Sequence, residues 1–357
     1  MSPYNLYALP GRACLDRSNA AFVTMLMGGP YHDQLLVLSQ MVISPRFVAA
    51  ILFVLVPRND GTMVSFSSQE WVLPVDDICN MFSRGVNKFY LEGATLLFNG
   101  SIYSEVKDVT KVNEIADCAR KYGTSMSLLL WTDDYPFDEC SPGKLNFTAF
   151  ERELQSYVTQ YNVDEVTFWI WAGKCEQFSW KISWKVSRII RRSLKTRSGK
   201  PVGASLGFSA EPLDSPLWKY IEKASVGRYF DTISVQFGYP GLFDRRTIDV
   251  AFARDVVHRL LNYGVPAKQI ELSVDTDGFQ ESTLQPMAYS ALIEEGAPRF
   301  SNGFFEDYIY QSQKQVYEKT NIIKEKGLRG FSLRSIIWDT PVDSCSSLLY
   351  AALYYRG

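Results

Sequence analysis

The chain has 357 residues, of which 46% are hydrophobic and 21% charged, and this composition excludes a disordered or collagen-like protein. Its 37 basic and 39 acidic side chains give a formal charge of -2, so the basic surface typical of a nucleic-acid-binding protein is not expected. Only two histidines are present, His32 and His258, which disfavours a metal site built from histidines. Nothing in the sequence indicates a metal or any other cofactor.

Residues 1–61 differ in character from the rest and are interpreted as an N-terminal extension. Their most apolar run is 47–56, which lies between Arg46 and Pro57. A helix of that length rises about 15 Å, which is too short for a bilayer core of about 30 Å but suits the apolar region of a signal peptide. Translation from Met41 would place a basic flank directly ahead of it. We therefore expect a secreted or secretory-pathway protein; the alternatives are a buried helix or an uncleaved membrane anchor in this segment.

Two further features bear on the compartment. Asn99 and Asn146 each begin an Asn-x-Ser/Thr sequon, which fits an extracytoplasmic address. The six cysteines contain no Cys-x-x-Cys pair, so zinc-ribbon and thioredoxin-like sites are excluded. Disulfides are possible, and their pairing is left open.

From residue 62 to residue 357, short β-branched or aromatic runs alternate with longer amphipathic segments. The predicted strands are 63–67, 88–92, 125–131, 165–171, 202–208, 232–237, 269–274 and 330–333. The predicted helices are 76–84, 110–122, 146–161, 179–196, 216–224, 249–263, 308–326 and 346–355. Eight strand-then-helix units predict an α/β fold of the (β/α)8 TIM barrel type, with its chemistry at the C-terminal ends of the strands. An open doubly wound sheet is the alternative, but no glycine-rich phosphate loop follows any strand.

Five segments of this region, 111–133, 147–173, 229–241, 262–279 and 326–339, occur in an order that points to one family. They resemble the third, fourth, sixth, seventh and eighth strand regions of glycoside hydrolase family 18, the chitinase family. The resemblance implies a (β/α)8 barrel whose fourth strand carries an Asp-x-x-Asp-x-Asp-x-Glu motif. In that family the glutamate protonates the glycosidic oxygen and the acetamido group of the substrate is the nucleophile.

The motif is degenerate in this chain. Only its first position is kept, as Asp164, while Thr167 and Trp169 stand at the two later aspartates. Trp171 stands at the acid glutamate, and an indole N–H cannot act as a general acid. Alternate strand residues share one face, so two indoles are expected to point into the barrel mouth. The resemblance therefore implies a member that is inactive by the family mechanism. Residues two apart lie at different depths along a strand, so we expect Trp169 in the core and Trp171 at the rim.

Two more departures concern the surroundings of that motif. The family has a tryptophan at the floor of its site in the eighth strand region, where this chain has Arg334. Arg334 is expected to bind a carboxylate or to neutralise a neighbour such as Asp275. Residues 275–329 leave little room beyond a loop and a helix, so the extra α+β insertion of many family members is expected to be absent or much reduced.

These observations define the candidate site residues and three hypotheses of function. The ligand-binding candidates are Trp131, Asp133, Trp171, Gln236, Tyr239, Asp275, Arg334 and Trp338. The favoured hypothesis is an inactive chitinase-like protein that binds a glycan, similar to a chito-oligosaccharide, or a protein partner; its tryptophans either stack on sugars or fill the barrel. The second is an active glycosidase with relocated carboxylates at Asp133, Asp134, Asp275 or Asp277. The third is a structural barrel without a small ligand.

Overall fold

The computed structural model describes residues 62–97, 99–132, 145–170, 176–238 and 248–354. The N-terminal extension, with segment 47–56, lies outside the described residues, so its role as signal or anchor stays a prediction. Among the helices that are described, none combines the length and the apolar character needed to cross a bilayer.

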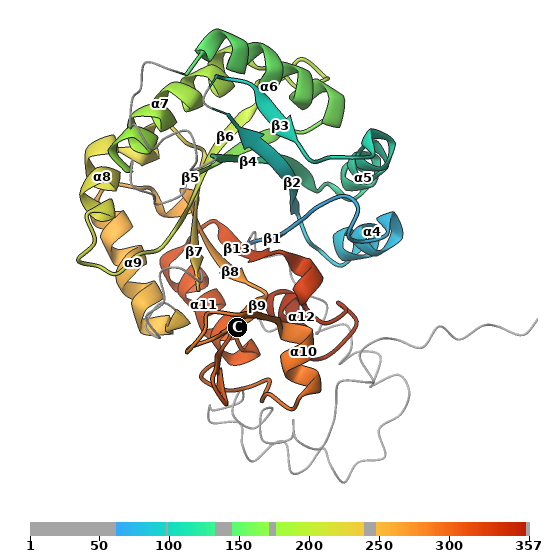
Figure 1. Ribbon diagram of the computed structural model, residues 1–357, viewed down its shortest axis with the longest axis vertical. Helices are drawn as coiled ribbons and strands as arrows, with labels where there is room; N and C mark the ends of the chain where they lie inside the picture. Colours follow the sequence, from blue (N-terminus) through green and yellow to red (C-terminus); the bar gives the residue numbers. More distant parts are fainter. Residues whose placement is uncertain (1–61, 98, 133–144, 171–175, 239–247, 355–357) are drawn as a thin grey trace, which may run out of the picture. The chain divides into compact units, whose positions relative to one another are not determined.

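Eight parallel strands form a closed barrel surrounded by helices (Figure 1). The barrel strands are β1 (Met63–Ser68), β2 (Lys88–Leu96), β4 (Ser125–Thr132), β5 (Glu165–Ile170), β6 (Gly203–Ser209), β7 (Thr232–Phe237), β8 (Ile270–Asp275) and β13 (Gly330–Arg334). Each pairs in parallel with the next, and the ring closes because β1 pairs with both β13 and β2. The prediction of a (β/α)8 barrel is confirmed, with strand boundaries close to those expected.

The helices of the outer ring also follow the predicted order. They are α4 (Val75–Ser83), α5 (Val109–Tyr122), α6 (Phe147–Tyr161), α7 (Glu176–Ser193), α8 (Leu217–Ala224), α9 (Val250–Asn262), α11 (Gln313–Lys326) and α12 (Leu348–Tyr354). Local sequence explains several of their ends. Asp108 caps α5 by accepting from the backbone N–H of Lys111 at 3.1 Å, and Gly123 ends that helix in the left-handed conformation, with φ at 70°.

The two faces of each barrel strand have opposite chemistry. On β5, Val166 and Phe168 belong to the apolar core beneath the helices, while Glu165 and Thr167 point into the barrel. The inward positions of the other strands are largely serine, threonine and charged residues, most of them buried. Polar side chains, many of them hydrogen-bonded to one another, therefore occupy most of this interior.

Five inward residues, which we call the floor cluster, lie toward the N-terminal ends of the strands. They are Lys88, Tyr90, Glu165, Glu271 and Arg329. The Lys88 ammonium forms an ion pair with Glu165, and the Tyr90 hydroxyl donates to Glu271 at 2.7 Å. Burial is the largest single effect and raises the pKa of Glu165, but the charge and hydrogen bond of Lys88, together with Ser205 and Arg329, outweigh it and lower that pKa. Burial raises the pKa of Glu271, because the nearby cations and the hydrogen bond from Tyr90 offset only part of the effect of burial.

A short insertion follows β8. Residues 277–309 form a four-stranded antiparallel sheet with a short helix, α10 (Tyr289–Glu294). Its strands are β9 (Asp277–Gln280), β10 (Pro286–Ala288), β11 (Phe304–Phe305) and β12 (Tyr308–Ile309). The sequence predicts an insertion that is absent or much reduced; it is present as this small sheet and one short helix. Strands of two to four residues are too short to show a period-two pattern, so they could not be predicted from the residue pattern.

Two smaller features complete the fold. Strand β3 (Ile102–Ser104) pairs antiparallel with the far end of β2 after an irregularity between Leu91 and Ala94, and it was not predicted. A disulfide joins Cys79 of α4 to Cys118 of α5. This bond resolves one of the pairings that the sequence left open.

Candidate functional site at the barrel mouth

Five side chains from five strands meet at the C-terminal ends of the barrel, and we call them the mouth cluster. They are Trp131 on β4, Trp169 on β5, Gln236 on β7, Asp275 on β8 and Arg334 on β13. In (β/α)8 proteins this end of the barrel carries the functional residues. Four of the five are predicted ligand-binding residues, and the fifth, Trp169, is a degenerate motif position.

The aromatic half of the cluster is a pair of indoles that face a guanidinium. The ring centroids of Trp131 and Trp169 lie 5.3 Å apart. The Arg334 guanidinium carbon lies 4.3 Å from the first ring centroid and 4.9 Å from the second, which is cation–π geometry. Trp169 rests against Gly207 of β6, where any Cβ would approach its benzene ring to 2.1 Å. Trp169 is 3% exposed, so its predicted place in the core is confirmed.

The polar half is a chain of hydrogen bonds that separates an anion from a cation. The Gln236 amide nitrogen donates to both Asp275 carboxylate oxygens, at 2.7 and 2.6 Å. Its amide oxygen accepts from Arg334 Nη1 at 2.5 Å and from the Ser209 hydroxyl at 3.2 Å. Arg334 therefore reaches Asp275 through Gln236 and makes no direct ion pair among the described residues. The predicted neutralisation of Asp275 by Arg334 is thus indirect.

The backbone around Arg334 is fixed on both sides. Its carbonyl accepts from the Thr276 backbone N–H at 3.2 Å and from the Thr276 hydroxyl at 3.0 Å. The next residue, Ser335, has φ at 53°, an unfavourable region for a residue with a side chain, and its N–H donates to the Ser67 hydroxyl at 2.9 Å. These contacts turn the chain sharply at the end of β13, so the Arg334 side chain is held over the indoles.

Two carboxyl groups have raised pKa values: that of Asp275 in the mouth cluster and that of Asp277, two residues later on β9. Burial raises the pKa of Asp275 to about 6, although Arg334 and the Gln236 amide oppose this and the Glu92 charge adds to it. Burial and the Asp275 charge raise the pKa of Asp277, at the start of β9, to about 8. Asp277 therefore holds its proton at neutral pH more readily than Asp275 does.

The positions of the family motif carry no inward carboxylate at the mouth. Asp164 accepts from the Met126 backbone N–H at 3.1 Å, which joins β4 to β5. The Thr167 hydroxyl is fully buried and lies 2.7 Å from the Ser127 hydroxyl. The indole of Trp169 occupies the next inward position. Thr167 and Trp169 are therefore packed structural side chains that can neither orient an acetamido group by charge nor give up a proton.

Other predicted residues stand apart from this cluster or cannot be placed. Trp338 lies in the turn after β13 and is 41% exposed, so its side chain is accessible, but no contact joins it to the cluster. Asp133, Asp134, Trp171 and Tyr239 lie outside the described residues. Trp171 at the rim therefore stays a prediction.

Sequence reasoning missed two residues that shape the cluster. Gly207 makes room for Trp169, and Ser209 donates to Gln236. A glycine inside a strand is a signal for close approach of another group, so Gly207 was detectable in principle. Ser209 carried no signal, because serine is common at the inward positions of this barrel.

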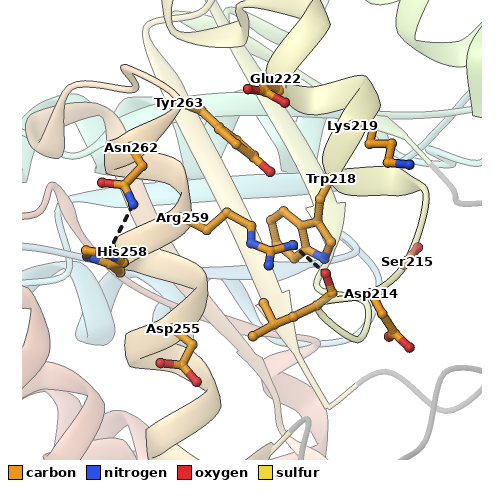
Figure 2. Close-up of a pocket in the computed structure, with 11 residues that line it drawn as sticks. Asp214, Ser215, Trp218, Lys219, Glu222, Asp255, His258, Arg259, Asn262 and Tyr263 are labelled. Carbon is orange, nitrogen blue, oxygen red and sulfur yellow. Dashed lines mark hydrogen bonds between the residues drawn. The ribbon is translucent and has the colours of Figure 1, made fainter.

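A pocket of about 620 Å³ lies elsewhere, on the outer ring between α8 and α9 (Figure 2). Arg259 lies 5.5 Å from the ring centroid of Trp218 and donates to the Leu213 carbonyl. His258 is exposed, and its Nε2 lies 3.0 Å from the Asn262 side-chain nitrogen. Both acidic and basic side chains line this pocket, and none of the predicted site residues does.

Comparison with known proteins places the fold. No family model and no curated protein sequence matches the chain. Solved structures do: a chitinase from Bacteroides thetaiotaomicron matches with a TM-score of 0.65 and 11% identity, over 83% of this chain and 96% of its own. A chitinase from Cycas revoluta in complex with (GlcNAc)3 matches with a TM-score of 0.61 and 14% identity, over 83% and 100%. A chitinase-like agglutinin from Robinia pseudoacacia matches with a TM-score of 0.64 and 13% identity, over 82% and 99%. The chain therefore has the chitinase-like (β/α)8 fold of glycoside hydrolase family 18.

Proposed function

We propose that this protein is a chitinase-like binding protein that holds a glycan at its barrel mouth and does not hydrolyse it. The observation that carries the proposal is the content of the inward positions of β5. Neither Thr167 nor Trp169 has a carboxylate. The Thr167 hydroxyl is hydrogen-bonded to the Ser127 hydroxyl, and the Trp169 indole packs between Gly207 and Arg334. Substrate-assisted hydrolysis needs a carboxyl group that protonates the glycosidic oxygen and a carboxylate that orients the acetamido group of the substrate.

A glycan is favoured over a protein partner by the chemistry of the mouth cluster. Trp131 is only partly buried and supplies an aromatic ring, while Gln236, Asp275 and Arg334 supply hydrogen-bonding groups around it. Sugars are bound by such combinations, because an aromatic ring stacks on the pyranose face and polar groups take the hydroxyls. Among the similar structures, one chitinase holds (GlcNAc)3 and another protein is an agglutinin, so both sugar binding and a lectin role are compatible with this fold.

Two assays on the purified chain test this proposal together. A fluorogenic N-acetylglucosamine oligomer should not be hydrolysed above a buffer blank, and Trp171→Glu alone should not restore hydrolysis, because Thr167 and Trp169 still lack carboxylates. A glycan array should give binding that Trp131→Ala weakens. Tyr122→Ala, which truncates an exposed aromatic on α5, is the matched control and should leave binding unchanged. Turnover of the oligomer, or an array without any signal, would contradict the proposal.

The second candidate is a glycosidase with relocated carboxylates. The observation in its favour is the pair Asp275 and Asp277, whose raised pKa values keep one proton available near neutral pH. If this candidate is right, a panel of aryl glycosides will include one that is turned over, and both Asp275→Asn and Asp277→Asn will abolish the turnover. Hydrolysis that survives either substitution would exclude it.

We propose that the protein enters the secretory pathway. The Cys79–Cys118 disulfide supports this, because such bonds persist in oxidising compartments. Both sequon asparagines, Asn99 and Asn146, are exposed. N-terminal sequencing of the native protein should place the mature end shortly after Pro57, and peptides from residues 1–40 in the mature protein would contradict this.

A further inference from the structure

The charges at the barrel mouth are not balanced. Three carboxylates, those of Glu92, Asp275 and Asp277, lie close enough to influence one another, since Glu92 acts on Asp275 and Asp275 on Asp277. One cation, Arg334, faces them, and its single hydrogen bond among the described residues goes to Gln236. Asp277 keeps its proton at neutral pH, so Glu92 and Asp275 against Arg334 leave a formal surplus of one negative charge, and Asp275 is buried. Such a surplus attracts a positively charged ligand.

Two buried polar atoms beside these carboxylates have no partner among the described residues. They are Oε1 of Glu92 and the indole nitrogen of Trp169. The benzene edge of Trp169 rests on Gly207, so the nitrogen, on the opposite edge of the ring, points away from β6. One atom needs a donor and the other an acceptor. A buried group of this kind is costly to leave unpaired, so both atoms indicate a polar ligand or water at this place.

The aromatic surface at the mouth already holds a cation. The Arg334 guanidinium lies over both indoles, 4.3 and 4.9 Å from their centroids, and no carboxylate forms a direct ion pair with it among the described residues. An electron-rich ring face favours positive charge over a neutral group of the same size. Arg334 already occupies the indole faces that it meets, so a preference for a cationic ligand must come from the carboxyl groups, which would repel an acidic sugar.

We infer that the mouth cluster selects an amine-bearing sugar, of the class of glucosamine oligomers, over the corresponding N-acetylated sugar. This inference rests on the proposed glycan-binding function and specifies its ligand. The ammonium group would neutralise the surplus of Asp275 and Asp277, and the sugar hydroxyls would pair with Glu92 and the Trp169 N–H. An acetamido group carries no charge and would leave the carboxylates uncompensated.

Isothermal titration calorimetry on the full chain tests this with four probes. They are a glucosamine tetramer, an N-acetylglucosamine tetramer, a neutral cellotetraose and a tetralysine peptide. The glucosamine tetramer should bind about tenfold more tightly than the acetylated one, which corresponds to one favourable charge interaction. Cellotetraose controls for sugar without nitrogen, and tetralysine controls for charge without sugar. Equal binding of tetralysine and the glucosamine tetramer would overturn the inference, because attraction of any polycation would then explain the result.

Variants locate the effect at the mouth. Asp275→Asn and Asp277→Asn should each reduce the preference for the glucosamine tetramer, while Asp255→Asn, on the outer pocket of Figure 2, should leave it unchanged. Circular dichroism melts confirm that each variant is folded. If one variant does not fold, the unaltered chain provides a second readout. At a pH where the free amine is already protonated, binding should release protons, because the ammonium favours ionised Asp277, and titrations in buffers of different ionisation enthalpy measure this.

The outcomes separate this inference from the proposed function. Tighter binding of the acetylated tetramer, or a preference that Asp277→Asn leaves intact without proton release, would overturn the choice of ligand while leaving glycan binding in place. Absence of binding by all three sugars would overturn both. Loss of the preference with Asp255→Asn would place the ligand on the outer ring and would also overturn the inference.

Discussion

The floor and the mouth of this barrel both hold charged side chains inside a ring of strands, yet they are organised differently. In the floor cluster Lys88 and Arg329 face Glu165 and Glu271, so formal charges cancel, and Lys88 contacts its carboxylate directly. At the mouth Arg334 is separated from Asp275 by an amide, and the carboxylates outnumber the cation. The formal charges of the floor are matched, although Oε2 of Glu271 and Nε of Arg329 have no hydrogen-bond partner among the described residues, whereas the carboxyl groups of the mouth outnumber its cation.

This difference assigns different roles to the two ends. A buried ion pair is strongly destabilising to break, because the remaining partner is left charged in a medium of low dielectric. A site kept for a ligand holds polar groups in place without satisfying all of them. We therefore expect the floor to determine the stability of the barrel and the mouth to determine what it binds.

The largest expected effect comes from breaking the floor. Lys88→Met removes the ammonium and keeps a side chain of similar length, so Glu165 remains buried without its partner. We expect a loss of about 3–5 kcal/mol in the free energy of unfolding, measured by urea denaturation. The double variant Lys88→Met/Glu165→Gln should recover part of that loss. A loss below about 1 kcal/mol for the single variant would mean that the floor does not carry the stability assigned to it.

The next effect is a change in how stability depends on pH. Between the ordinary carboxyl range and about pH 8, the folded protein keeps a proton on Asp277 that the unfolded chain releases. Stability should therefore fall as the pH rises through this window. Asp277→Asn should flatten that fall, so its melting temperature should exceed that of the unaltered chain at pH 9 and match it at pH 4. Parallel pH profiles for the two proteins would show that Asp277 titrates normally.

The smallest expected effect on stability comes from the cation of the mouth. Arg334→Met removes one hydrogen bond to Gln236 and the contact with two indoles, so we expect a loss of about 1–2 kcal/mol. Urea denaturation beside Lys88→Met gives the direct comparison of two inward cations. If Arg334→Met costs as much as Lys88→Met, the mouth is a structural network like the floor.

The sequence was sufficient for the barrel because alternation of strands and amphipathic helices is a local property. The eight strands and their order followed from runs such as 125–131 and 232–237, and the degenerate motif at Thr167 and Trp169 could be read directly. Residues close in sequence determine such patterns. The insertion after β8 escaped because its strands are too short for a pattern.

What the sequence could not give was the pairing of charges inside the barrel. Lys88 and Glu165, 77 positions apart, meet only because parallel strands stagger around a closed ring, and the same closure brings Arg334 to Gln236, 98 positions away. The sequence by itself determined the barrel, the absent motif carboxylates and most members of the mouth cluster. Only the tertiary structure decided that Gln236 stands between Asp275 and Arg334, because strand register and side-chain packing, and not residue type, set which polar groups come within hydrogen-bonding distance.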